Sequence, residues 1–191
     1  MHETFQRIEK SYQHSGLDCL TLSIAYPIFD GSKNRMNSYY RHKEIQLEKL
    51  VKKRILPLAK SYVEDALRNN ASFRPWSVKY QCRFTYNSES TASLLREVSL
   101  IRGRRRETII MSSETWDTQT GFLLKLKAFA NRRYVIKQLK AHSGGDRQLK
   151  KYLIAHFSSE NFYLTNSGIV IYYPARGLHI LIPGTTASSE H

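Results

Sequence analysis

The chain has 191 residues, 41% of them hydrophobic and 12% aromatic, and its 30 lysines and arginines outnumber 16 acidic residues, giving a formal net charge of +14. So many aromatic residues exclude a disordered chain, and two cysteines, Cys19 and Cys82, are too few for a disulfide-rich secreted scaffold or a four-cysteine zinc site. A chain of this length buries about 70% of the surface that it exposes when unfolded, so we expect a folded basic domain.

Neither export nor membrane insertion has a visible signal. Residues 1–10 include acidic side chains and lack the apolar core of a signal peptide. The longest wholly apolar stretches, such as residues 168–174, fall far short of the ~20 residues that a membrane-spanning helix needs. We therefore expect a cytoplasmic protein with reduced cysteines and no membrane span.

The first half of the chain predicts a strand followed by one long helix. Residues 1–17 read as a polar N-terminal extension, and the alternation over residues 20–24 then predicts a strand with one buried face. Asn37 or Ser38 can cap a helix that ends near residue 70, and Pro57 should kink it because proline lacks a backbone N–H. Apolar residues at steps of three and four predict one buried stripe, made of Leu47, Leu50, Val51, Ile55, Leu58, Tyr62 and Ala66.

Three strands are predicted next. The first has apolar side chains at every second position, namely Trp76, Val78, Tyr80, Cys82, Phe84 and Tyr86. Such regular alternation is typical of a strand with one buried face. Further strand-like runs lie at residues 94–101 and 107–116, so the middle of the chain predicts an antiparallel meander.

Two short helices and three short strands complete the chain. Asn131 and Asp146 can cap the helices, and the strands are expected near residues 162–164, 169–173 and 178–182. This order lacks the regularity of βαβ units and predicts an α+β fold, with an antiparallel or mixed sheet packed against one long kinked helix and two short helices. We expect a single domain over residues 18–184 and a flexible tail at 185–191.

No combination of residues indicates catalysis. Nucleotide-binding, nucleophile-elbow and zinc-protease motifs are absent from the sequence, and its seven histidines have no metal-ligand spacing. Asp117, close to Glu114, precedes Thr-Gln-Thr-Gly and is better explained as a turn former. His142, Ser143 and Asp146 have the residue types of a triad, but they surround a predicted helix end. We expect no enzymatic activity, no metal and no cofactor.

Basic residues concentrate between positions 102 and 151, where thirteen lysines and arginines face four acidic residues. A field of this sign attracts polyanions. Arg104 to Arg106 are three consecutive arginines in a predicted short turn, where their positive charges repel one another unless an anion binds them. The candidate partner-binding residues are Arg104, Arg105, Arg106, Arg132, Arg133, Lys150 and Lys151. A solvated face that only keeps the protein soluble is the alternative.

Several stretches are similar to the C-terminal domain family of the anti-sigma-V factor RsiV, and most of all to short stand-alone Firmicute members. They are the strand ending at Tyr26-Pro27, the long helix opened by Asn37, the predicted meander, Trp116–Gly121 with Leu124 and Leu126, and Asn161–Val170. The last stretch, containing Phe-Tyr-Leu-Thr and Gly-Ile-Val, is the most specific. The resemblance covers about residues 18–184.

The resemblance implies a binding module and not an enzyme, because membrane-anchored relatives use this domain outside the cell to bind lysozyme. This chain departs from the family at Arg102–Arg106, where a Gly-Gly-Ala-His-Gly-like stretch is common, and in a shortened segment between Tyr173 and Gly177. Lysozyme is itself basic, and a chain of charge +14 would repel it. We therefore expect an acidic protein or another polyanion as the partner and not lysozyme. A nucleic-acid-binding domain is the alternative function.

Overall fold

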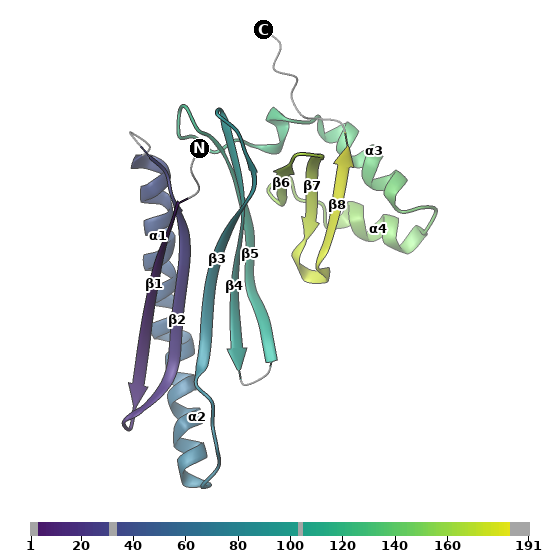
Figure 1. Ribbon diagram of the computed structural model, residues 1–191. Helices are drawn as coiled ribbons and strands as arrows, with labels where there is room; N and C mark the ends of the chain where they lie inside the picture. Colours follow the sequence, from purple (N-terminus) through teal and green to yellow (C-terminus); the bar gives the residue numbers. More distant parts are fainter. Residues whose placement is uncertain (1–3, 31–33, 103–104, 184–191) are drawn as a thin grey trace. The chain divides into compact units, whose positions relative to one another are not determined.

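The computed structural model describes residues 4–30, 34–102 and 105–183 (Figure 1). The chain divides into two compact units. We call residues 2–83 with 96–111 the long-helix unit, and residues 84–95 with 112–191 the short-helix unit. The expected limits of one domain at residues 18 and 184 stay a prediction.

A five-stranded sheet has the strand order β1-β2-β3-β4-β5. The strands are β1 (Thr4–His14), β2 (Leu17–Ile28), β3 (Trp76–Asn87), β4 (Thr91–Arg102) and β5 (Arg105–Asp117). β1 and β2 are antiparallel, whereas β2 and β3 are parallel and are joined through the long helix. The sheet is therefore mixed, and the predicted α+β class is confirmed.

Strand β1 was not predicted as an element, because residues 1–17 were interpreted only as a polar extension. It forms one edge of the sheet and pairs with β2, with Ile8 opposite Ile24. Its exposed and half-buried residues alternate, without one fully buried side chain. An edge strand that faces solvent on one side needs no apolar run, so its sequence resembles that of a polar tail.

The long helix is kinked as predicted. It consists of α1 (Asn34–Leu50), a π-helical turn (Val51–Ile55) and α2 (Leu56–Arg68), with Pro57 in the first turn of α2. Pro57 has no N–H to donate to a carbonyl of the preceding turn, so it interrupts the hydrogen-bond ladder where the π-helical turn continues into α2. The π-helical turn precedes this position and separates the two α-helical segments.

The predicted buried stripe is partly wrong. Leu58 and Tyr62 are 60% and 41% exposed, whereas Ala59 and Val63 are completely buried. The buried positions run in steps of four from Leu47 through Val51, Ile55 and Ala59 to Val63. Steps of four drift around a regular α-helix of 3.6 residues per turn, and the wider π-helical turn compensates for this drift. The apolar stripe of α2 is therefore shifted by one residue.

Asn37 does not cap the helix, which begins three residues earlier. Its side chain instead binds the backbone of Phe29 directly after β2: Asn37 Nδ2 donates to the Phe29 oxygen and the Phe29 N–H donates to Asn37 Oδ1, both at 2.9 Å. This amide pair ties the start of α1 to the end of β2.

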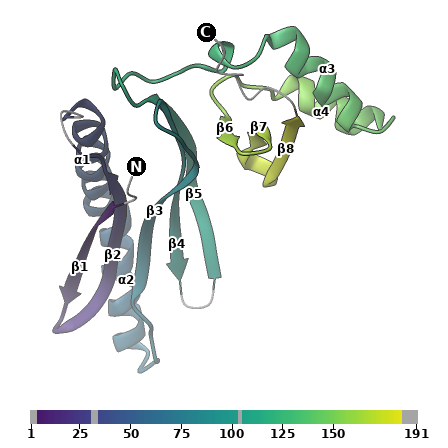
Figure 2. The ribbon, with the colours of Figure 1, turned by 45° about the horizontal axis from the view of Figure 1, so that its top comes forward.

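The short-helix unit contains α3 (Arg132–His142), α4 (Arg147–Ala155) and a three-stranded sheet of order β6-β7-β8. The strands, all antiparallel, are β6 (Phe162–Thr165), β7 (Gly168–Tyr173) and β8 (Leu178–Pro183). Short 3-10 turns lie at Leu126–Ala128 and Pro174–Arg176. The two helices pack against each other beside this sheet (Figure 2). The predicted short helices and strands are confirmed.

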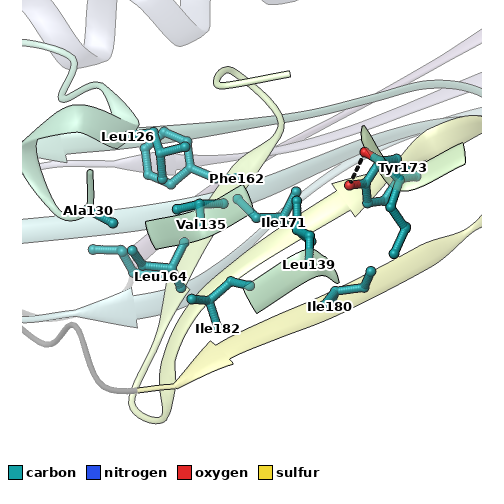
Figure 3. Packing of buried hydrophobic residues seen from close by; sticks show 12 residues of the cluster. Leu126, Ala130, Val135, Leu139, Phe162, Leu164, Ile171, Tyr173, Ile180 and Ile182 are labelled. Carbon is teal, nitrogen blue, oxygen red and sulfur yellow. Dashed lines mark hydrogen bonds between the residues drawn. The ribbon is translucent and has the colours of Figure 1, made fainter. Parts of the chain in front are cut away.

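The core of the short-helix unit joins the inner faces of α3 and α4 to one face of the sheet. Val135 and Leu139 from α3 and Leu153 from α4 are fully buried against side chains of all three strands (Figure 3). Because the apolar sides of both helices are occupied by this core, their opposite sides face solvent. In the described part of the chain, no helix is long and apolar enough to cross a membrane.

Candidate binding surface

The arginine-rich bend between β4 and β5 is partly paired within the chain. Arg106 Nη2 lies 2.7 Å from Glu97 Oε1, and Arg102 Nη2 lies 2.9 Å from Glu107 Oε2. Arg105 is exposed, and Arg104 lies outside the described residues. Exposed ion pairs contribute little to stability, but each one cancels a positive charge that an external anion would otherwise meet.

Helix α3 presents a second basic group. Asn131 caps the helix, its Oδ1 accepting the N–H of Arg133 at 2.7 Å. With this start, Val135 and Leu139 face the core, and the residues on the opposite side are exposed. The exposed cations of α3 are Arg132, Arg133, Lys137 and Lys140.

Helix α4 has the same division into faces. Asp146 Oδ1 accepts the N–H groups of Gln148 at 2.8 Å and Leu149 at 3.0 Å, so its carboxylate is used as the helix cap. Leu153 is buried and Leu149 packs against the core. The exposed cations of α4 are Arg147, Lys150 and Lys151.

We call these seven cations of α3 and α4 the basic helical pair. Among the residues that the structure describes, no carboxylate lies within ion-pair distance of any of them, in contrast to Arg102 and Arg106. The only acidic residue from Arg132 to Ala155 is Asp146, whose carboxylate caps α4. The basic helical pair is thus a concentrated positive charge that the chain's own described carboxylates leave uncompensated.

Aromatic rings in this unit are covered by the chain's own arginines. The guanidinium carbon of Arg176 lies 3.9 Å from the ring centroid of Tyr152, and that of Arg132 lies 5.8 Å from Phe157. Both rings also pack against the core. Arginine over an aromatic face is a favourable cation–π arrangement, and these contacts use ring faces on which a nucleic-acid base could stack.

The residues considered for catalysis have structural roles instead. Asp117 Oδ1 accepts the N–H groups of Gln119 and Thr120, and these backbone hydrogen bonds lower the pKa of its carboxyl group. The prediction of a turn-forming Asp117 is confirmed. Ser143 is buried and its hydroxyl donates to the carbonyl of Lys140 at 2.7 Å, while Asp146 caps α4, so the residue types of a triad are not assembled.

Over the described part of the chain, no group of three or more His, Cys, Asp or Glu residues is placed to hold a metal ion. Both cysteines are buried, and neither forms a disulfide. They lie on neighbouring parallel strands, but the register places Gln81 opposite Ala25. Cys82 is therefore level with Tyr26, about 23 Å along the sheet from Cys19, whereas a disulfide requires Cα atoms within roughly 7 Å.

Sequence reasoning identified the basic residues but not which of them are paired. Glu97 and Glu107, one on either side of the bend, were the signal that could have predicted the pairing. Opposite charges on adjacent strands can form ion pairs across a hairpin. The predicted residues are divided between the two units. Arg105 and Arg106 belong to the long-helix unit, whereas the short-helix unit contains Arg132, Arg133, Lys150 and Lys151.

Comparison with solved structures shows a known fold. The chain is similar to a DUF3298 family protein of Bacteroides fragilis with 18% identity and a TM-score of 0.59, covering 95% of this chain and 90% of that one. A DUF3298 family protein of Pseudomonas aeruginosa has 14% identity and a TM-score of 0.52, covering 96% and 91%. The DUF3298 family includes the RsiV C-terminal domain, so the fold implied by the sequence resemblance is confirmed.

Comparison at the level of sequence gives no match. No family model matches the chain, and none of the curated proteins is significantly similar to it.

Proposed function

We propose that this chain is a non-enzymatic, RsiV-like binding module whose basic helical pair binds an acidic protein. The observation that carries the proposal is the set of seven exposed cations on α3 and α4, with no described carboxylate in ion-pair distance. Like charges held together on a rigid surface repel one another, and an anionic partner relieves this repulsion. The proposed module is of the Firmicute type and acts in the cytoplasm.

The arginine-rich bend has a smaller role in this proposal than the helices. Arg106 and Arg102 already have carboxylates at 2.7 and 2.9 Å, so an incoming anion must compete with Glu97 and Glu107. The cations of the basic helical pair require no such exchange. The bend can still add positive potential through Arg105, which is exposed.

An acidic protein suits the basic helical pair better than a nucleic acid does. Single-stranded nucleic acids bind basic grooves in which aromatic side chains stack on the bases. Here Tyr152 and Phe157 pack inward, and Arg176 and Arg132 lie over their rings. The exposed face of the helices therefore offers charge without stacking platforms, which fits carboxylate side chains of a protein partner.

Fluorescence anisotropy with defined probes tests the proposal. The probes are a labelled peptide of alternating Glu and Gly, single-stranded and duplex DNA of the same net charge, and lysozyme as a basic control protein. At about 50 mM salt, we expect the peptide to bind at least as tightly as either DNA, and lysozyme not to bind.

Two outcomes contradict the proposal. At least tenfold tighter binding of DNA, weakening steeply between about 50 and 200 mM salt, would support the nucleic-acid alternative instead. Absence of peptide binding at low salt would show that the exposed cations form only a solvated surface.

A further inference from the structure

The long-helix unit contains a groove that is formed without any residue of the basic helical pair. It has a volume of about 220 Å³ and lies between α1 and the strands β3, β4 and β5. Leu47, Tyr80 and Val98 are buried residues at its base. Leu50 and Ile110 add apolar surface, and Ile110 is 39% exposed.

Two cations stand among these apolar side chains. Lys43 projects from α1, and its Nζ lies 5.2 Å from the ring centroid of Tyr39. Arg96 projects from β4, with its guanidinium carbon 5.8 Å from the ring centroid of Tyr80. Gln46 is the remaining polar residue, and the described lining contains no carboxylate.

We propose that this groove binds a peptide segment of an acidic protein, taking one large apolar side chain while a neighbouring carboxylate contacts Lys43 or Arg96. Pockets for complete small ligands usually measure about 300–1,000 Å³, so the observed volume suits a single anchoring side chain. Burial of such an anchor in a pocket commonly dominates the energy of an interface, and the positive lining selects for a negative neighbour.

The groove shares no residue with the basic helical pair, because all of its lining residues belong to the long-helix unit. The two surfaces also differ in what they require. The helices need only negative charge, whereas the groove needs an apolar side chain beside that charge. Two peptides of equal charge therefore distinguish them.

The test compares the peptides Glu-Glu-Gly-Phe-Gly-Glu-Glu and Glu-Glu-Gly-Ser-Gly-Glu-Glu, with blocked ends, binding to the full chain. Methyl NMR signals of Leu50, Val98 and Ile110 report on the groove. We expect the Phe peptide to shift these signals and to bind at least tenfold more tightly than the Ser peptide, because the buried ring adds hydrophobic contact. Lys43→Glu should weaken the Phe peptide about fivefold or more, whereas the matched control Lys49→Glu, exposed on the same helix outside the groove, should change it less than twofold.

Equal affinity for the two peptides would overturn the groove proposal while leaving the basic helical pair as the binding surface. Methyl shifts that avoid Leu50, Val98 and Ile110 would also overturn it, even if the Phe peptide binds more tightly. The peptide comparison on the unmodified chain needs no variant, so a folding defect of Lys43→Glu cannot obscure the result.

Discussion

Arg106 Nη2 lies 2.7 Å from Glu97 Oε1, so a carboxylate of the chain already meets one arginine of the bend between β4 and β5. Arg102 and Glu107 form a second pair beside it. The seven cations of the basic helical pair have no such partner among the described residues. This contrast moves the centre of the proposed binding surface from the bend to α3 and α4.

Gly168 begins β7 with a φ of +137°, a backbone conformation that favours glycine. A Cβ atom added there would clash with the backbone oxygen of Ile182. Because this oxygen belongs to the backbone and not to a flexible side chain, it cannot easily move aside. We expect Gly168→Ala to lower the free energy of unfolding by at least about 3 kcal/mol, measured by urea denaturation.

Gly144→Ala is the matched control for this substitution. Gly144 also has a positive φ, +55°, but its added Cβ meets nothing within 4 Å. Gly144→Ala should lower the free energy of unfolding by only about 1–2 kcal/mol, which is the strain of a left-handed residue with a side chain. Equal losses of unfolding free energy in the two variants would show that the clash with Ile182 does not destabilise Gly168→Ala.

Tyr173 is a buried phenol whose hydroxyl donates to the carbonyl of Leu153 at 2.9 Å (dashed line in Figure 3). Tyr173→Phe leaves this carbonyl without its donor and should cost about 1–2 kcal/mol. Burial, with a smaller contribution from Tyr152, raises the pKa of Tyr173 to about 12. The neutral form is therefore favoured by folding, so its stabilisation is complete below pH 10 and is lost as the pH rises towards 12.

Urea titrations of the wild type and Tyr173→Phe at pH 9 and pH 11.5 measure this effect. The difference in unfolding free energy between the two proteins should shrink at the higher pH, because above pH 10 the Tyr173 phenol ionises in the unfolded wild type while it stays largely protonated in the folded protein. A constant difference over this range would contradict the raised pKa.

Glu48 on α1 joins β1 to the long helix. Its carboxylate lies 2.7 Å from Lys10 on β1 and 2.8 Å from Lys52 on the π-helical turn, and hydrogen bonds from these two residues lower the pKa of Glu48. A lowered pKa in the folded state gives stability above the unfolded value of 4.5, which is lost as the pH falls through the folded value.

Glu48→Gln should therefore be less stable than the wild type at pH 7 and should lose less stability on acidification below pH 4.5. Chemical denaturation at pH 7 and pH 3 measures both effects. Equal acid sensitivity of the two proteins would show that Glu48 does not contribute to it.

Cys19 and Cys82 cannot pair, because the register of β2 and β3 separates them by about seven residues along the sheet. Thiol titration of the denatured protein, prepared without reductant, should give two free thiols per chain. A single intramolecular disulfide would contradict the register of these strands.

Most elements of the fold could be predicted because they depend on local signals. The alternation from Trp76 to Tyr86 and the side-chain caps Asn131 and Asp146 each act within a few residues. Leu58 and Tyr62 were misplaced because a π-helical turn changes the helical period without a clear mark in the sequence. Strand β1 was not predicted because it forms a strand by pairing with β2, which lies later in the chain, and its own residues carry no strong strand pattern.

The candidate surface was predictable only in part. The density of Lys and Arg between residues 102 and 151 is visible in the sequence. The pairing of Arg106 with Glu97 depends on how β4 and β5 lie side by side, and the groove at Lys43 and Arg96 depends on how α1 packs on the sheet. Such contacts between distant residues have no local signature.

Charge reversal on the basic helical pair tests the central claim most directly. The variant carries Arg133→Glu, Lys150→Glu and Lys151→Glu, and the matched control carries Lys53→Glu, Lys79→Glu and Arg83→Glu, three exposed cations of the long-helix unit. Affinity for the Glu-Gly peptide should fall at least tenfold in the variant and less than about threefold in the control, because local contacts add to the change in overall charge. Equal losses in the two proteins would show that net charge alone attracts the peptide and would contradict a binding surface on α3 and α4.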